Sequence, residues 1–196
     1  HRVEVVATAG KWESYRLPRL GIPIARGWFR QDDWPQNAAL YGPLTPRSYL
    51  AWLRDMGVRY VLLADTHRDP SAREEAALIQ RGDVLPRVAR LPHWTVYEVP
   101  HATPIVTPAS GARILALAPQ AVAVRVRRAG AYRLRLSYTP YWAVTGPACV
   151  AARRPWGMLL RARAPGKVVL RFQVSTEAIL DSLIGGDHCP APAPPG

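Results

Sequence analysis

The stretch AVAVRVRRAGAYRLRLSY, residues 121–138, predicts most directly how the second half of this chain folds. Apolar and polar side chains alternate along it from Val122 to Tyr138, so each kind falls on one face of an extended strand. Such alternation with one apolar face is typical of antiparallel strands that are packed on one side. Similar segments, separated by glycine or proline, cover residues 111–118, 120–128, 130–138, 156–164 and 166–174. Residues 104–188 are therefore predicted to form an antiparallel β-sandwich.

The first half of the chain, residues 1–103, alternates strands with helices. Thr45 and Asp69 are suited to begin helices as N-caps, and the continuous apolar run Val58–Ala64 is typical of a buried strand. The expected order is a strand at 1–9, a helix at 45–57, a strand at 58–64, a helix at 70–80 and a strand at 94–99. This order predicts a small α/β unit with a partly parallel sheet, and it assigns the whole chain to the α+β class.

Composition excludes several classes of protein. The chain has 196 residues, is 48% hydrophobic and contains seven tryptophans, which is unlike a disordered chain. Two cysteines are too few for a disulfide-dense scaffold, and no stretch approaches the roughly 20 apolar residues of a membrane span. The net charge is +12, but arginine outnumbers lysine 24 to 2, and no acidic residue occurs between His101 and Thr176. The basic excess therefore lies in the β-rich half.

This basic excess falls on alternating strand positions, where one electrostatic face is expected on the solvent side of the sheet. Its residues are Arg125, Arg127, Arg133 and Arg135. Two interpretations fit: the arginines keep half-buried strands soluble and discourage edge pairing, or they bind anionic lipid headgroups or acidic glycans. No aromatic residues are interleaved with them as a base-stacking platform would require, which argues against nucleic acid as the partner.

The connection from Gly10 to Pro43 is predicted to be a long loop, rich in tryptophan, proline and arginine and longer than an ordinary connection. It contains the adjacent carboxylates Asp32 and Asp33. Carboxylates, amides and indoles together are the groups that bind sugars, so a ligand site is predicted at Trp28, Arg30, Asp32, Asp33, Trp34 and Asn37. Helix capping or pairing with arginine also explains the two aspartates. Acid/base catalysis would need both in one site, which adjacent residues rarely share.

The segment from Trp12 to Arg30 combines aromatic residues with arginines. Arg16, Arg19, Arg26 and Arg30 would bind an anionic or glycosidic headgroup. The aromatic rings would also serve to cover a sheet edge or to pack on membrane-embedded parts of a longer protein. The sequence has no metal-ligand spacing, no nucleophile motif and no glycine-rich phosphate loop. No metal and no cofactor are therefore expected, and whether the chain is an enzyme is left undecided.

Cys149 and Cys189 are the two cysteines, and two alternatives stay open for them. They close a loop of about 40 residues in an exported domain, or they are unpaired thiols. Residues 189–196 are rich in proline and alanine and are expected to be a disordered tail. The chain opens on apolar strand residues without an initiator Met, so it is interpreted as a piece of a longer protein.

Four segments, in this order, resemble a known family. They are WLRDMGVRYVLL (52–63), WTVYEVPHATPIV (94–106), LSYTPYW (136–142) and the dipeptide PG (165–166) before the last strand. Together they resemble the extracytoplasmic C-terminal region of polytopic bacterial membrane proteins of the glycosyltransferase C type. The likeness is to the family implicated in glycosylating teichoic acids. The resemblance implies an α/β unit and a sandwich above the membrane, next to the transmembrane portion of the same chain.

The sequence departs from this family in one respect that bears on function. No segment matches the membrane-proximal acidic motif that carries catalysis in such enzymes. The resemblance therefore implies an accessory domain on the extracytoplasmic side of the membrane, which helps bind or orient a glycan or lipid-linked sugar. The alternative is a stand-alone basic module that binds acidic polysaccharide, anionic lipid or nucleic acid.

Overall fold

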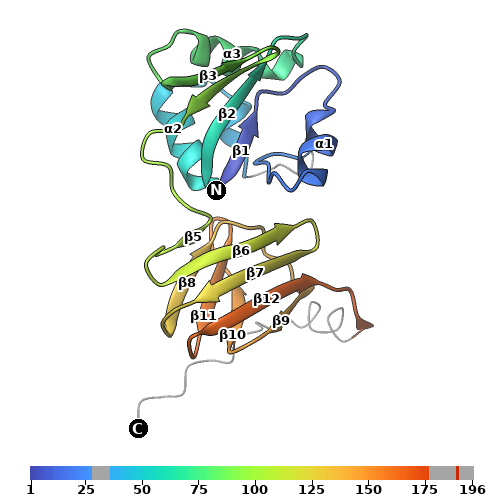
Figure 1. The fold of residues 1–196 in the computed structure, drawn as a ribbon, viewed down its shortest axis with the longest axis vertical. Coiled ribbons are helices and arrows are strands. Elements are labelled where there is room, and N and C mark those ends of the chain that lie inside the picture. Colours follow the sequence, from blue (N-terminus) through green and yellow to red (C-terminus); the bar gives the residue numbers. More distant parts are fainter. Residues whose placement is uncertain (28–35, 177–188, 190–196) are drawn as a thin grey trace. The chain divides into compact units, whose positions relative to one another are not determined.

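The computed structural model describes residues 1–27, 36–176 and 189. The chain divides into two compact units, His1–Pro104 and Ile105–Gly196, and the boundary predicted from the sequence lay between residues 103 and 104. Both units contain β-sheet, and the described helices belong to the first unit, which makes the chain α+β (Figure 1).

The first unit is built on a four-stranded sheet with the order β1-β2-β4-β3. Its strands are β1 (Arg2–Val5), β2 (Val58–Ala64), β3 (Arg87–Leu91) and β4 (Trp94–Glu98). β1 and β2 pair in parallel, whereas β4 pairs antiparallel with both β2 and β3. The parallel pair matters for the site, because the carboxyl ends of its two strands meet at one edge of the sheet.

The described helices of the first unit are α1 (Glu13–Arg19), η2 (Ala38–Leu40), α2 (Pro46–Asp55), η3 (Pro70–Ala72) and α3 (Arg73–Gln80). Two of them, α2 and η3, begin at the N-caps that the sequence predicts. Thr45 Oγ1 accepts the backbone N–H of Ser48 at 3.1 Å, and Ser48 Oγ accepts that of Thr45 at 3.1 Å, which completes a capping box at α2. Asp69 Oδ1 accepts the N–H of Ser71 at 2.9 Å, so both predicted caps are confirmed.

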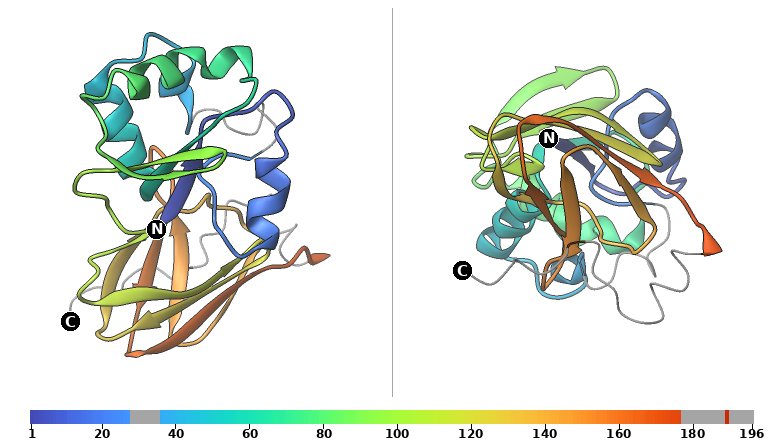
Figure 2. Two further views of the ribbon diagram at one scale, coloured as in Figure 1. Left: turned by 45° about the horizontal axis from the view of Figure 1, so that its top comes forward. Right: turned by 90° about the horizontal axis from the view of Figure 1, so that it is seen from below.

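Helix α1 corrects the expectation of a loop between Gly10 and Pro43. It lies beside β1 (Figures 1 and 2). None of its residues is buried. A helix that buries no side chain has no apolar stripe in its sequence, so the pattern did not predict it. Glu13 in its first turn holds it instead, because the Glu13 carboxylate accepts the N–H of Thr8 at 2.9 Å and the Thr8 hydroxyl at 2.7 Å.

The second unit consists of two four-stranded sheets in which every strand pair is antiparallel. One sheet has the order β10-β11-β8-β5, and its strands are β5 (Val106–Thr107), β8 (Gly130–Leu134), β10 (Ala148–Ala152) and β11 (Met158–Ala162). The other has the order β6-β7-β12-β9, and its strands are β6 (Ala112–Ala118), β7 (Ala121–Val126), β9 (Trp142–Thr145) and β12 (Gly166–Phe172).

The two sheets of the second unit share one hydrophobic core. The alternation along β7 buries Val122, Val124 and Val126 in this core, as the sequence predicts. Leu134 of β8 and Leu160 of β11 come to it from the other sheet. The stretch 130–138 was expected as one strand, but β8 ends at Leu134. The N–H of Arg135 still donates to the Ile105 carbonyl at 2.8 Å, and residues 135–138 lie outside the strand.

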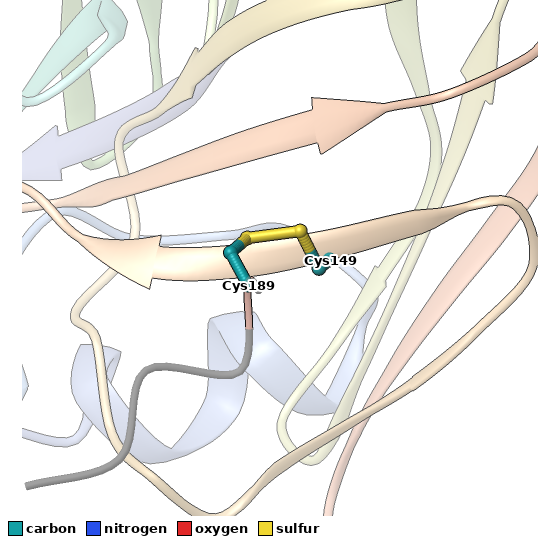
Figure 3. Close-up of a disulfide and its surroundings, with 2 residues drawn as sticks. All are labelled: Cys149 and Cys189. Atoms are coloured by element: carbon teal, nitrogen blue, oxygen red, sulfur yellow. A yellow bond between two sulfur atoms is a disulfide. The ribbon is translucent and has the colours of Figure 1, made fainter. Parts of the chain in front are cut away.

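Cys149 and Cys189 form a disulfide, which settles the two alternatives left by the sequence (Figure 3). Their Cα atoms lie 5.1 Å apart, and 40 positions separate them in the chain. Cys189 is only 7% exposed, so the prediction that the tail begins at residue 189 is wrong for this residue. Residues 190–196 lie outside the described part of the chain. No helix within that part has the length and apolar character needed to cross a membrane.

Candidate functional site

A network of buried charges lies under the carboxyl end of β1. Glu4 of β1 is fully buried and Glu75 of α3 is 2% exposed. Arg26 lies between them: its Nη2 donates to Glu75 Oε2 at 2.8 Å and also to Glu4 Oε1. The Tyr49 hydroxyl donates to Glu75 Oε1 at 2.8 Å. One guanidinium therefore faces two carboxylates, and a phenol shares the second of them.

The protonation states of this network follow from its burial. Burial by itself lowers the pKa of Arg26, but the carboxylates of Glu4 and Glu75 raise that pKa by more, so the guanidinium stays charged. Burial, together with the two carboxylates, raises the pKa of Tyr49 well above its ordinary value. The phenol therefore keeps its proton and remains a hydrogen-bond donor to Glu75.

A small polar pocket opens next to this network, at the carboxyl end of β1. Its cavity volume is about 40 Å³. Its polar lining includes Glu4, Lys11, Glu13, Ser14, Arg26 and Ser71. A cavity of this volume admits a few waters, because one water needs roughly 10–15 Å³. The pocket therefore offers carboxylate, ammonium and hydroxyl groups to the hydroxyls of a ligand lying at its mouth, and a whole sugar ring does not enter it.

Two residues that line this pocket, Lys11 and Ser71, contact the carboxylate of Asp69. Lys11 Nζ lies 3.4 Å from Asp69 Oδ2, and the hydroxyl of Ser71 donates to Asp69 Oδ1 at 2.6 Å. The Ser71 hydroxyl is the largest cause that lowers the pKa of Asp69 to about 2, and the Ser71 N–H and Lys11 add to the effect. The Asp69 carboxylate is therefore charged throughout the physiological range.

Replacing Ser71 with Ala is expected to raise the pKa of Asp69 from about 2 toward its ordinary value of 3.8. Because the folded state holds this proton less tightly than the unfolded state, Asp69 stabilises the fold above pH 4. That contribution is lost as the pH falls from about 4 to about 2. Carboxyl-carbon NMR titration measures the pKa. Ser14→Ala is the control, and an unchanged pKa of Asp69 in Ser71→Ala would show that the hydroxyl does not set it.

An exposed aromatic and basic face covers α1 and its two flanking residues. Trp12, Tyr15 and Leu20 are 58%, 49% and 73% exposed. Arg16 and Arg19 lie on the same face, because residues three and four apart share one side of a helix. The Arg16 guanidinium carbon lies 5.8 Å from the Trp12 ring centre, and that of Arg19 lies 5.1 Å from the Tyr15 ring centre. Arg26, by contrast, belongs to the buried network, so its guanidinium is not available to bind a headgroup.

Most of the predicted ligand site lies outside the described residues: Trp28, Arg30, Asp32, Asp33 and Trp34. Asn37 is described and is 2% exposed. Its side-chain oxygen accepts the indole N–H of Trp52 at 3.0 Å. The amide that the sequence suggested for ligand binding is therefore used inside the fold.

The four arginines expected on one electrostatic face belong to two different sheets. Arg125 of β7 is exposed and so is Arg127, which follows that strand. Arg133 belongs to β8 of the other sheet and is half-buried, 5.9 Å from the Trp156 ring centre. Arg135 is only 7% exposed and donates to Thr107 Oγ1 at 3.1 Å. Alternation predicts which side of its own sheet a residue faces, but it does not predict which sheet the strand joins. For this reason the expectation of one electrostatic face was wrong.

No protein-family model, curated protein or solved structure matches this chain. Within residues 1–27, 36–176 and 189, no group of three or more His, Cys, Asp or Glu side chains is arranged to hold a metal ion. The site is therefore interpreted from its own geometry.

The Glu4–Arg26–Glu75 network was missed at the level of sequence, because its members lie far apart in the chain. One signal was present: Glu4 is an acidic residue in the middle of the apolar run Val3–Val6. A carboxylate at a buried strand position requires a cation or several donors. The sequence alone does not say which of the arginines supplies them.

Proposed function

We propose that this chain is an extracytoplasmic accessory region of a polytopic bacterial membrane protein of the glycosyltransferase C type. It helps the parent protein to bind or orient a glycan or a lipid-linked sugar, and it works beside the transmembrane portion of the same chain. We further propose that the two sheets of the second unit, which share one core, form a β-sandwich.

The observation that carries the ligand-binding part of this proposal is the polar pocket at the carboxyl end of β1. Ligands of α/β sheets commonly bind beyond the carboxyl ends of parallel strands. Glu13, Lys11 and Ser71 offer an acceptor, a donor and a hydroxyl at this edge, which suits a polyhydroxylated ligand. Gly27, which also lines the pocket, directly precedes the predicted ligand segment 28–37 in sequence.

Two further features support the proposed location. A disulfide between Cys149 and Cys189 is consistent with an oxidising compartment. The exposed face of α1 combines Trp12, Tyr15 and two arginines, the residue types that are enriched where proteins meet the membrane–water interface. Such a face suits a region held next to a membrane or to membrane-embedded helices.

A binding screen against neutral oligosaccharides tests the proposal. The chain is expected to bind a subset of them, and Trp28→Ala or Asp33→Ala is expected to weaken that binding by about ten-fold, because stacking and charge-assisted hydrogen bonds are lost. Leu91→Ala, at an exposed position of β3, is the matched control and is expected to have no effect. Binding that is unchanged in both site variants would contradict the proposed site.

A second function, the stand-alone basic module, is favoured by one specific observation. Residues 105–176 of the second unit contain twelve basic residues and no acidic one. Electrostatic binding of a polyanion weakens steeply with salt, whereas binding of a neutral sugar does not. Salt titration therefore distinguishes the two functions.

A further inference from the structure

Three cations lie in one row across the sheet β6-β7-β12-β9. Arg113 of β6 is directly opposite Arg125 of β7, and Arg125 is directly opposite Lys167 of β12. Directly opposite residues of antiparallel strands point to the same face of the sheet, with their Cα atoms about 4.5–5.5 Å apart. All three residues are exposed, while their strand neighbours Val124, Val126 and Val168 point into the core. The row therefore stands on the solvent face.

Such a row is unfavourable for the isolated fold, because like charges directly opposite each other destabilise a sheet. Sheets usually avoid this cost by placing an acidic residue opposite a basic one. Here no acidic residue exists anywhere in residues 105–176, so this stretch of the second unit supplies no carboxylate to the row. The fold keeps three adjacent cations whose charge only an anion from outside this stretch can neutralise.

The rest of this face indicates the kind of anion. The register places Ala116, Ala118, Ala121, Ala123 and Ala143 on the same face, together with Thr145, Val169 and Arg171. No aromatic ring belongs to these face positions, so nucleobases have nothing to stack on. Leu115 at the β6 bulge is 40% exposed, but one aliphatic side chain is a weak anchor in a bilayer. Alanines are therefore the commonest residues around the three cations on this face.

We propose that this cationic row, Arg113, Arg125 and Lys167, binds an acidic polysaccharide that runs across the strands. Neighbouring strands lie about 4.8 Å apart, a spacing close to the length of one sugar unit, so a polymer in this direction meets one cation at about every unit. The small side chains of the alanines on this face let the sugar rings lie close to the sheet. The inference deepens the alternative function, since it names a polyanion for the basic unit, and it does not require the pocket at β1.

Equilibrium binding of the whole chain to polygalacturonate tests this proposal, with dextran as the neutral polymer. The site variant is Arg113→Gln/Arg125→Gln/Lys167→Gln. The control variant is Arg154→Gln/Arg161→Gln/Arg163→Gln, which loses the same charge from exposed positions that do not belong to the row. The site variant is expected to bind polygalacturonate about 30-fold more weakly and with a shallower salt dependence, whereas the control is expected to change by less than about three-fold.

Equal losses in the two variants would overturn the proposal, because they would show that only net charge matters. Oligothymidylate and phosphatidylcholine vesicles that contain phosphatidylglycerol are tested as alternative ligands. If either binds more tightly than polygalacturonate and loses that binding in the site variant, the proposal is overturned in favour of that ligand. Misfolding does not confound the test, because removing three repelling charges is expected to keep or raise the melting temperature at low salt. The neutral-oligosaccharide screen with the Trp28 and Asp33 variants fails or succeeds independently, so the two proposals are told apart.

Discussion

Replacing Arg26 with Met is expected to lower the free energy of unfolding by about 3–5 kcal/mol, which is the usual cost of removing one partner of a buried ion pair. The Arg26 side chain is 12% exposed, and its Nη2 donates to both Glu4 and Glu75. Without the guanidinium, the two buried carboxylates of Glu4 and Glu75 lose their shared counter-ion. Urea denaturation of the 196-residue chain measures the loss.

Two comparisons make this result specific to the network. Arg19→Met, on the exposed face of α1, is expected to change the free energy of unfolding by less than about 1 kcal/mol. The triple variant Glu4→Gln/Arg26→Met/Glu75→Gln removes all three charges and is expected to recover much of the stability, since the buried charges no longer lack a counter-ion. A loss below about 1 kcal/mol in Arg26→Met would contradict the buried network.

Removing the disulfide with Cys149→Ser/Cys189→Ser is expected to lower the free energy of unfolding by about 4 kcal/mol, because a loop of this length is no longer closed in the unfolded chain. The bond joins residues 40 positions apart and ties Cys189 to β10. Thermal and urea unfolding of the oxidised protein and of the double variant give the difference.

Reduction of the unaltered protein supplies the control for the serine substitutions. The reduced protein is expected to be as unstable as the double variant, and the oxidised protein is expected to show no thiol that reacts with a thiol reagent under denaturing conditions. Two reactive thiols in the oxidised protein, or equal stability with and without reductant, would contradict the disulfide.

The sequence predicted best the parts of the fold where local pattern and burial agree. The alternation along β7 identified its buried valines, and the capping residues Thr45 and Asp69 identified helix starts. In both cases the role of a residue depends on residues close to it in the sequence, which a local pattern can show. Short strands such as β5, with two residues, and β9, with four, carry too few positions for a period to show.

The parts that could not be predicted depend on contacts between distant segments. Arg26 finds its carboxylates on β1 and α3, and Asn37 finds the indole of Trp52. Arg125 and Arg133 looked alike in sequence, but they belong to different sheets. The cationic row became visible only with the register of β6, β7 and β12, because its three residues come from three different strands.

Protease treatment of intact spheroplasts of the cells that produce this chain tests the proposed function most directly. An antibody against the second unit follows the protein through cell fractionation and proteolysis. The predicted result is an antigen in the membrane fraction, with a mass well above the 21.7 kDa of this chain, that external protease degrades. An antigen in the cytosolic fraction that external protease leaves intact would contradict an extracytoplasmic region of a membrane protein.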